Sequence, residues 1–116
     1  MAAHRDLEAW KAARAVSIAV LRISRTAWRP YLAAVFRQLQ RSSLSVQLNV
    51  AEGYASGPGA RCRHHMIIAY GSAIETDDLL EILRDEGHIK AEDAERVLAD
   101  CRSSQRLIRG LVKRYQ

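Results

Sequence analysis

The chain has 116 residues, of which 48% are hydrophobic and only 6% aromatic, and its 18 Lys and Arg against 13 Asp and Glu give a formal net charge of +5. This length suits one core, so we expect a single domain over residues 1–116. Arginines interrupt every apolar run before it reaches the ~20 residues of a membrane span. The two cysteines form no close pair and no apolar leader precedes Asp6, which favours a soluble, cytoplasmic protein.

The first predicted helix begins near Asp6, whose carboxylate can accept backbone N–H groups as an N-cap, and ends between Ser24 and Trp28. Its apolar residues recur at three- and four-residue intervals, as in an amphipathic helix: Leu7, Trp10, Ala13, Val16, Val20 and Ile23. Its basic residues fall on another side: Lys11, Arg14, Arg22 and Arg25. Pro30 predicts a break, because proline disfavours helical geometry at the residue before it.

A second helix is predicted from Pro30 to about Glu52, with the proline in the first turn, where its missing N–H is harmless. Its inner face combines apolar and small residues: Leu32, Val35, Phe36, Leu39, Ser43, Val46 and Val50. Gly53 and the stretch 56–59, which adds two more glycines and a proline, predict the end of this helix and the clearest loop in the chain.

The third helix is predicted from residues 60–63 to Glu86, before Gly87 as a C-terminal stop, and the fourth follows a short connection at 88–90 and runs to Tyr115. Each has one apolar stripe. That of the third is Cys62, Met66, Ala69, Ala73, Thr76, Leu80 and Leu83, and that of the fourth is Ala94, Val97, Leu98, Cys101, Leu107, Ile108, Leu111 and Val112. Four such helices with short links predict an all-α fold, an antiparallel up-down-up-down four-helix bundle.

The charges are unevenly distributed along the chain. Residues 1–60 hold eight basic and three acidic side chains, residues 61–87 hold three and six, and residues 88–116 hold seven and four. A basic molecule with one acidic segment can attract nucleic acid, or copies of itself.

A basic stripe on the fourth helix is the strongest candidate for binding. Arg102, Arg106, Arg109 and Lys113 follow one another at steps of four, three and four, and no acidic residue follows Asp100. A shorter stripe on the second helix consists of Arg37 and Arg41. Such stripes can bind the phosphates of RNA or DNA, although each is also compatible with an ordinary solvated helix face.

Other chemistry is poorly supported by the sequence. Cys62, His64 and His65 lack the spacing of a zinc site, so we expect no metal. The acidic residues of the third helix could hold a cation, but pairing with arginines explains them more simply. We see no Gly-rich phosphate loop, nucleophile elbow or His/Ser or Cys/His pair with a predictable geometry, so we expect no enzyme, no catalytic residue and no cofactor.

A polar tract interrupts the second helix at Asn49, Glu52 and Gly53. We interpret it as structural: Asn49 and Glu52 share a helix face and can bond freed backbone groups near the glycine, or reach Ser72 and Glu75 on the third helix. A buried carboxylate would need such partners.

Three segments carry a family likeness: D-L-E-A-W-K-x-A over 6–13, Q-L-x-R-S-S-x-S-V over 38–46 with N-V-A-E-G-Y over 49–54, and A-x-G-S-x-x-E over 69–75. In order and spacing they resemble the 23S ribosomal-RNA intervening-sequence proteins. The resemblance implies a cytoplasmic, homopentameric four-helix bundle without established enzymatic activity. That family is also similar in fold to the accessory proteins of diversity-generating retroelements, which bind a reverse transcriptase and nucleic acid.

Two functions follow as hypotheses. The first is a non-enzymatic, oligomeric protein that binds nucleic acid, or a reverse transcriptase, through basic helix faces. The alternative is a protein-interaction scaffold with no nucleic-acid role.

Overall fold

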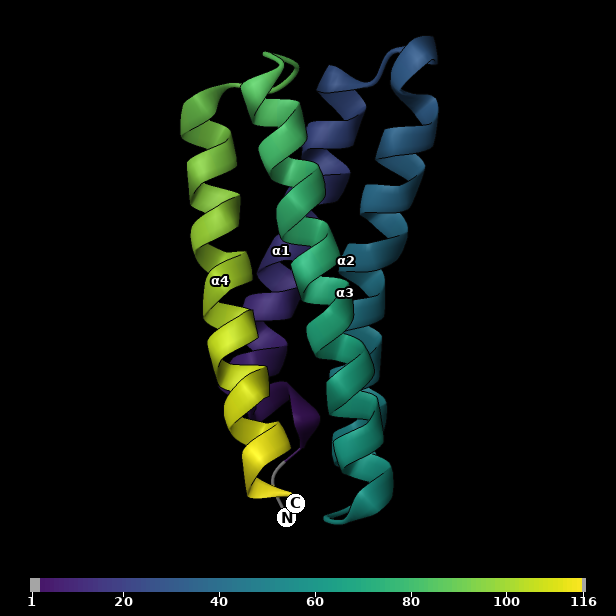
Figure 1. Ribbon diagram of the computed structural model, residues 1–116, viewed down its shortest axis with the longest axis vertical. Coiled ribbons are helices and arrows are strands. Elements are labelled where there is room, and N and C mark those ends of the chain that lie inside the picture. Colours follow the sequence, from purple (N-terminus) through teal and green to yellow (C-terminus); the bar gives the residue numbers. More distant parts are fainter. Residues whose placement is uncertain (1–2, 116) are drawn as a thin grey trace.

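The computed structural model describes residues 3–115 and consists of four long antiparallel helices (Figure 1). They are α1 (Glu8–Ala27), α2 (Ala33–Ala55), α3 (Ala60–Asp85) and α4 (Ala91–Arg114), with short 3-10 helices at His4–Asp6 and Pro30–Leu32. The helices run up, down, up and down, so both ends of the chain lie at one end of the bundle, beside the turn between α2 and α3. The predicted all-α, up-down-up-down bundle is confirmed.

The start of α1 differs from the prediction. Asp6 lies in the preceding 3-10 helix, and the residue that caps α1 is Leu7, whose side chain makes no capping hydrogen bond. The predicted N-cap at Asp6 is therefore wrong, because the 3-10 turn moves the first turn of α1 beyond the reach of its carboxylate. At the other end of α1, Arg29 is extended, with φ −139° and ψ 152°, as Pro30 requires of its neighbour.

Gly53 does not end α2, in contrast to our expectation. It is buried inside the helix, which continues to Ala55. The reversal falls in the predicted loop at 56–59, where Gly57 and Gly59 have positive φ angles of 77° and 133° that are readily reached only without a side chain. A glycine inside a helix and a glycine in a turn look alike in the sequence, and only the packing distinguishes them.

The turn after α3 follows the prediction. Gly87 has φ 76°, its N–H donates to the carbonyl of Arg84, and the N–H of His88 donates to the carbonyl of Leu83 at 2.8 Å. These two bonds make up a Schellman motif, which ends α3 and satisfies two of its last carbonyl groups.

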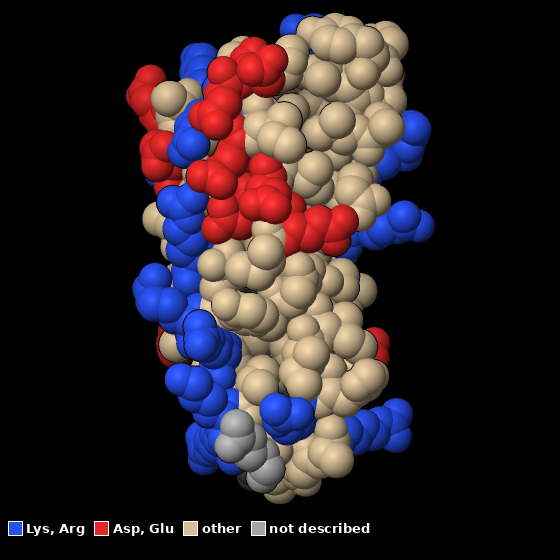
Figure 2. All heavy atoms as spheres, viewed as in Figure 1, with Lys and Arg blue, Asp and Glu red and all other residues tan. Residues whose placement is uncertain are grey.

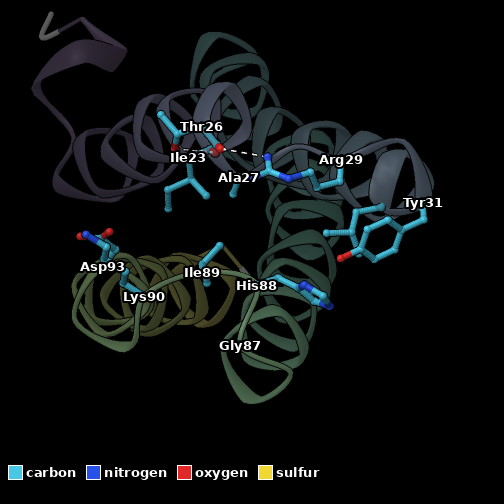
Figure 3. Close-up of a pocket in the computed structure, with 11 residues that line it drawn as sticks. Ile23, Thr26, Ala27, Arg29, Tyr31, Gly87, His88, Ile89, Lys90 and Asp93 are labelled. Carbon is cyan, nitrogen blue, oxygen red and sulfur yellow. Dashed lines mark hydrogen bonds between the residues drawn. The ribbon is translucent and has the colours of Figure 1, made fainter.

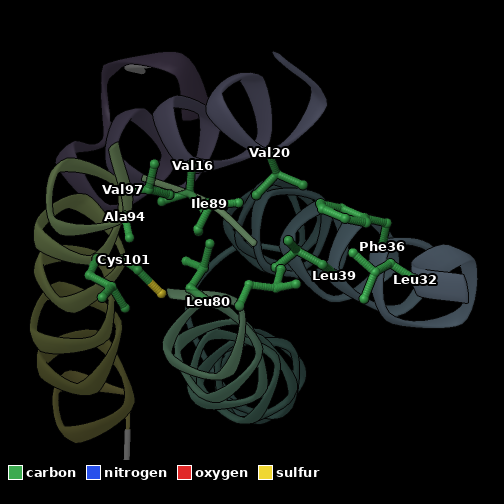
Figure 4. Close-up of a cluster of buried hydrophobic side chains, with 12 residues drawn as sticks. Val16, Val20, Leu32, Phe36, Leu39, Leu80, Ile89, Ala94, Val97 and Cys101 are labelled. Atoms are coloured by element: carbon green, nitrogen blue, oxygen red, sulfur yellow. The ribbon is translucent and has the colours of Figure 1, made fainter. Parts of the chain in front are cut away.

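The core consists of two apolar clusters, one above the other along the bundle. The cluster near the α1–α2 and α3–α4 turns, drawn in Figure 4, includes Phe36, Leu39 and Leu80. The other cluster is built largely from small residues around Met66 and Ile108. Buried hydroxyl side chains lie near the boundary between the two clusters: Ser17, Ser42, Ser43, Thr76 and Ser104. Each donates a hydrogen bond to a neighbouring carbonyl or hydroxyl group, so little polarity is left unsatisfied there.

Candidate nucleic-acid interface

The predicted basic stripe of α4 lies on the molecular surface. Arg106, Arg109 and Lys113 are exposed, and they belong to one face of the helix because they are three and four residues apart. In Figure 2, basic side chains follow the edge of the molecule that α4 forms, toward the end that holds the chain termini. Among residues 3–115 these three side chains form no ion pair; Arg106 only donates a hydrogen bond to Ser103 of its own helix.

Arg102, the first residue of the stripe, is engaged within the chain. Its guanidinium lies 3.2 Å from a carboxylate oxygen of Asp77 and 3.2 Å from one of Glu81, both on α3. The hydrogen bond to Asp77 raises the pKa of Arg102 above its usual value, with further contributions from the charges of Asp77, Glu81 and Glu95. Arg102 therefore joins α4 to α3, and the part of the stripe that remains open to a phosphate begins at Arg106.

The acidic residues of α3 gather in a band over its C-terminal half, seen as the red area of Figure 2. Much of this band is paired with arginines: Arg84 lies between Glu81, Asp85 and Glu95, at 3.5, 2.9 and 2.8 Å, and Arg102 approaches from α4. The expected pairing of these acids with arginines is found within one copy. Asp77, Asp78 and Glu81 also lie close together, but Arg102 already pairs with two of them, so they are a poor site for a cation.

The second basic stripe lies elsewhere. Arg37 and Arg41 are exposed on α2, and α2 and α4 occupy opposite corners of the bundle because both pack against α1 and α3. One copy therefore does not combine the two predicted stripes into one surface.

The tract at Asn49 lies in a polar seam between α2 and α3. Asn49 shares a hydrogen bond of 3.0 Å with His65 and donates another to Ser45, and Glu52 lies 3.8 Å from His65. The two expected partners also belong to the seam, but with other residues: Ser72 bonds Ser45 at 2.8 Å, and Glu75 accepts from Gln38. The seam joins α2 to α3 as expected, and Gln38, Ser45 and His65 are members that the sequence did not indicate. Glu52 itself is exposed, so its carboxylate needs no buried partner.

The close approach of α2 and α3 at the seam depends on Gly53. A Cβ atom added there would lie 3.0 Å from Cβ of His65, 3.1 Å from Cε of Met66 and 3.2 Å from the carbonyl oxygen of Cys62. Two of these atoms belong to the backbone or the root of a side chain on α3 and cannot move freely. Gly53 thus permits the close approach of the two helices.

The candidate metal residues at the start of α3 do not converge. Cys62 is buried in the core, and burial raises the pKa of its thiol, which disfavours the thiolate that a metal needs. His64 is exposed with its ring edge-on to that of His65, at 6.2 Å between centroids, and His65 bonds Asn49. The thiol of Cys62 lies in the core, apart from the two histidines, so the three side chains do not form one ligand set.

A hollow of about 530 Å³ lies at the end of the bundle opposite the chain termini, between the α1–α2 and α3–α4 turns (Figure 3). The polar side chains of this hollow make contacts within and between the two turns. The guanidinium of Arg29 donates to the carbonyls of Thr26 and Trp28 at the end of α1, and the ring of His88 stacks edge-on against Tyr31 at 5.8 Å. This arrangement caps a helix and does not bring together an acid, a base and a nucleophile.

A membrane span is not found among the described helices, none of which is both long and apolar enough.

A family model described as 23S rRNA-intervening sequence protein matches residues 5–110 of the chain. The chain belongs to this family. The match runs from the residues before α1 into the C-terminal part of α4, so this intervening-sequence family member carries the family's sequence pattern over the whole bundle, as the three motifs indicated.

A solved structure shares the fold of this intervening-sequence family member. It is described as a protein with unknown function from the S23 ribosomal protein family of Bacteroides thetaiotaomicron, and it superposes with a TM-score of 0.79 over 90% of this chain and 98% of that chain. The two sequences are 20% identical, so the likeness supports the fold alone. No curated protein matches the chain.

Proposed function

We propose that the protein is a non-enzymatic, self-associating protein of the cytoplasm that binds the phosphate backbone of RNA or DNA along the C-terminal half of α4. The observation that carries this proposal is the contrast between two parts of the molecule. Arg84 and Arg102 are paired with acidic residues of α3, and Arg84 also with Glu95 of α4, whereas Arg106, Arg109 and Lys113 are exposed without an acidic partner in residues 3–115. An unpaired row of cations is available to an external polyanion.

One copy supplies too few cations for tight binding, because exposed charges are solvated and screened by salt. Repetition of the row in an oligomer would multiply the cations that one polyanion meets and raise avidity, although the site of each copy is unchanged. The family resemblance implies five copies, which is the number we propose. The aromatic side chains near the row, Tyr70 and Tyr115, are partly buried against the core, so we expect recognition of the backbone rather than of particular bases.

A second candidate function is a scaffold for another protein, such as the reverse transcriptase that the fold-level resemblance implies. It is favoured by isoleucines that α3 exposes to solvent, including Ile67 and Ile82. The two functions differ in the surface they use, since one depends on the charges of α4 and the other on the apolar face of α3.

Binding of single-stranded RNA and duplex DNA across a salt series tests the proposal. Replacement of Arg106, Arg109 and Lys113 by glutamine is expected to weaken binding and to reduce the slope of log K against log salt by about 0.7 to 0.9 for each phosphate that the variant no longer neutralises. Arg102→Gln removes one charge that is already paired, so it is the matched control for the single variant Arg106→Gln and is expected to change affinity less than that variant does. Absence of binding by the wild-type protein at low salt, or an unchanged affinity in the triple variant, would contradict the proposal.

A further inference from the structure

The outward face of α3 is unusually apolar for a surface exposed to water. Ile67, Gly71, Ile74, Asp78 and Ile82 are all exposed and lie on one side of the helix, at steps of four, three, four and four. The three isoleucines expose 44%, 39% and 55% of their surface. Figure 2 shows a broad area without charge on the lower part of this side of the molecule, and the acidic band crosses its upper part. A contiguous apolar area of this kind is typical of a contact surface.

Gly71 lies in the middle of this face and points to close contact with another helix. Nothing lies within 4 Å of a Cβ atom added there, so the fold of one copy does not require a glycine. A glycine inside a helix costs about 1 kcal/mol relative to alanine, and nothing within the monomer offsets this cost. A helix of another molecule that packs across Gly71 would fill the space left by the missing side chain.

The outward face of α2 complements this surface. Leu44 and Leu48 are exposed there, by 39% and 54%, and they continue the row begun by Arg37 and Arg41. Arg37, Arg41 and Asp78 form no ion pair among residues 3–115, so charges of opposite sign remain available on the two faces. The α2 face is apolar and basic, and the α3 face is apolar and acidic.

The two faces also match in height along the bundle. The hydrogen bonds of the seam fix the levels: Gln38 is beside Glu75, Ser45 is beside Ser72, and Asn49 is beside His65 on the antiparallel neighbour. The neighbouring residues on the outward faces then lie at matching levels: Arg37 with Asp78, Leu44 with Gly71, and Leu48 with Ile67. Each pair matches within a few ångströms, because the helix rises about 1.5 Å per residue. Copies related by rotation about an axis along the bundle keep these heights.

We infer that the outward face of α2 in one copy packs against the outward face of α3 in the next. Leu44 then enters the space over Gly71, Leu48 meets Ile67, and Arg37 approaches Asp78. This inference rests on the self-association in the proposed function and names the surfaces that produce it. The α4 row borders this contact at Arg109, which lines a shallow hollow together with Ile67.

The contact is heterologous, because it joins two different surfaces. The α2 and α3 faces lie on adjacent corners of the bundle and point in different directions, so each added copy turns the assembly and the copies can close into a ring. An alternative contact of α3 with α3 would leave its acidic residues without basic partners, and one of α2 with α2 would do the same for its arginines. Charge complementarity therefore favours the mixed contact.

Two variants that each damage one face test the inference. Leu44→Glu with Leu48→Glu places acids opposite the acidic α3 face, and Ile67→Glu with Ile74→Glu removes its apolar centre. All four side chains are exposed, so the bundle is expected to fold, which circular dichroism checks. Leu21→Glu with Leu107→Glu is the matched control, since these leucines are similarly exposed on α1 and α4.

Light scattering after size exclusion gives the masses. The wild type and the control are expected to be oligomers, and each face variant a monomer of about 13.0 kDa. Mixing the two face variants is the decisive step, because one retains an intact α3 face and the other an intact α2 face: we expect a 1:1 dimer that grows no further. A monomeric wild type, face variants that keep the wild-type mass, or a mixture that stays monomeric would each overturn the inference. A monomeric wild type would also contradict the self-association in the proposed function, whereas the other two outcomes overturn only the surfaces named here. Nucleic-acid binding is measured in a separate experiment.

Discussion

Replacement of Gly53 by leucine is expected to destabilise the protein by roughly 3 kcal/mol, because the seam between α2 and α3 has no room for a side chain. Even the first added carbon would lie 3.0 Å from Cβ of His65 and 3.2 Å from the carbonyl oxygen of Cys62. Relief of this crowding requires α3 to move away from α2. That movement would stretch the bonds of Asn49 and Ser45 across the seam.

Urea unfolding followed by circular dichroism measures this effect, and alanine variants supply the comparison. Gly110→Ala adds the same atom to open space on α4, outside the contact inferred above, so we expect it to stabilise the protein by about 0.5 to 1 kcal/mol through helix propensity. At Gly53 the same gain is opposed by crowding, so Gly53→Ala should be less stable than Gly110→Ala by at least about 1 kcal/mol. Equal stabilities for the two alanine variants would show that the space between α2 and α3 accommodates a methyl group at position 53, and would contradict the prediction.

The helices and their order were predictable because the relevant signals are local. Apolar residues at three- and four-residue spacing identify the inner face of each helix, and Gly87 ends α3 through bonds to residues at most five positions away. Pro30 opens a helical segment, although it forms a 3-10 turn before α2 begins at Ala33. These features depend little on what lies elsewhere in the chain.

Apart from the N-cap at Asp6, which a local 3-10 turn displaced, the errors and omissions concern contacts between distant parts of the chain. Gly53 was expected to end α2. A glycine is needed there because residues 62–66 of α3 leave no room for a side chain, and the residues around Gly53 in the sequence do not show this contact. Arg102 was grouped with the open stripe of α4 because its partners Asp77 and Glu81 lie more than 20 residues earlier. Spacing along one helix shows which residues share a face but not what that face meets.

The sides of α3 illustrate how one helix serves several purposes. One side packs in the core, a second bonds α2 through Ser72 and His65, and a third binds Arg102 of α4. The remaining side is apolar with Gly71 at its centre and has no partner among residues 3–115 of one copy. A helix of a lone bundle would be expected to carry charged residues on that side, and this difference supports self-association.

Alkaline conditions are expected to destabilise the protein through Cys101. Burial in the core, with a smaller contribution from the charge of Asp77, raises the pKa of this thiol from 9.0 to about 12. Above pH 9 the thiol of the unfolded chain loses its proton while the folded thiol keeps it, so the unfolded state binds fewer protons and stability falls as the pH rises. The slope approaches about 1.4 kcal/mol per pH unit between about pH 9 and about pH 12.

Comparison with Cys101→Ala isolates this contribution, because every other ionisable side chain is present in both proteins. We expect the variant to be less stable near pH 8, since it loses the packing of the sulfur and its hydrogen bond to the carbonyl of Ala73. The difference in unfolding free energy should then shrink by about 2 to 3 kcal/mol between about pH 8 and about pH 11, as only the wild type must keep a buried thiol protonated. A difference that stays constant over this range would mean that the Cys101 thiol ionises as readily in the folded chain as in water.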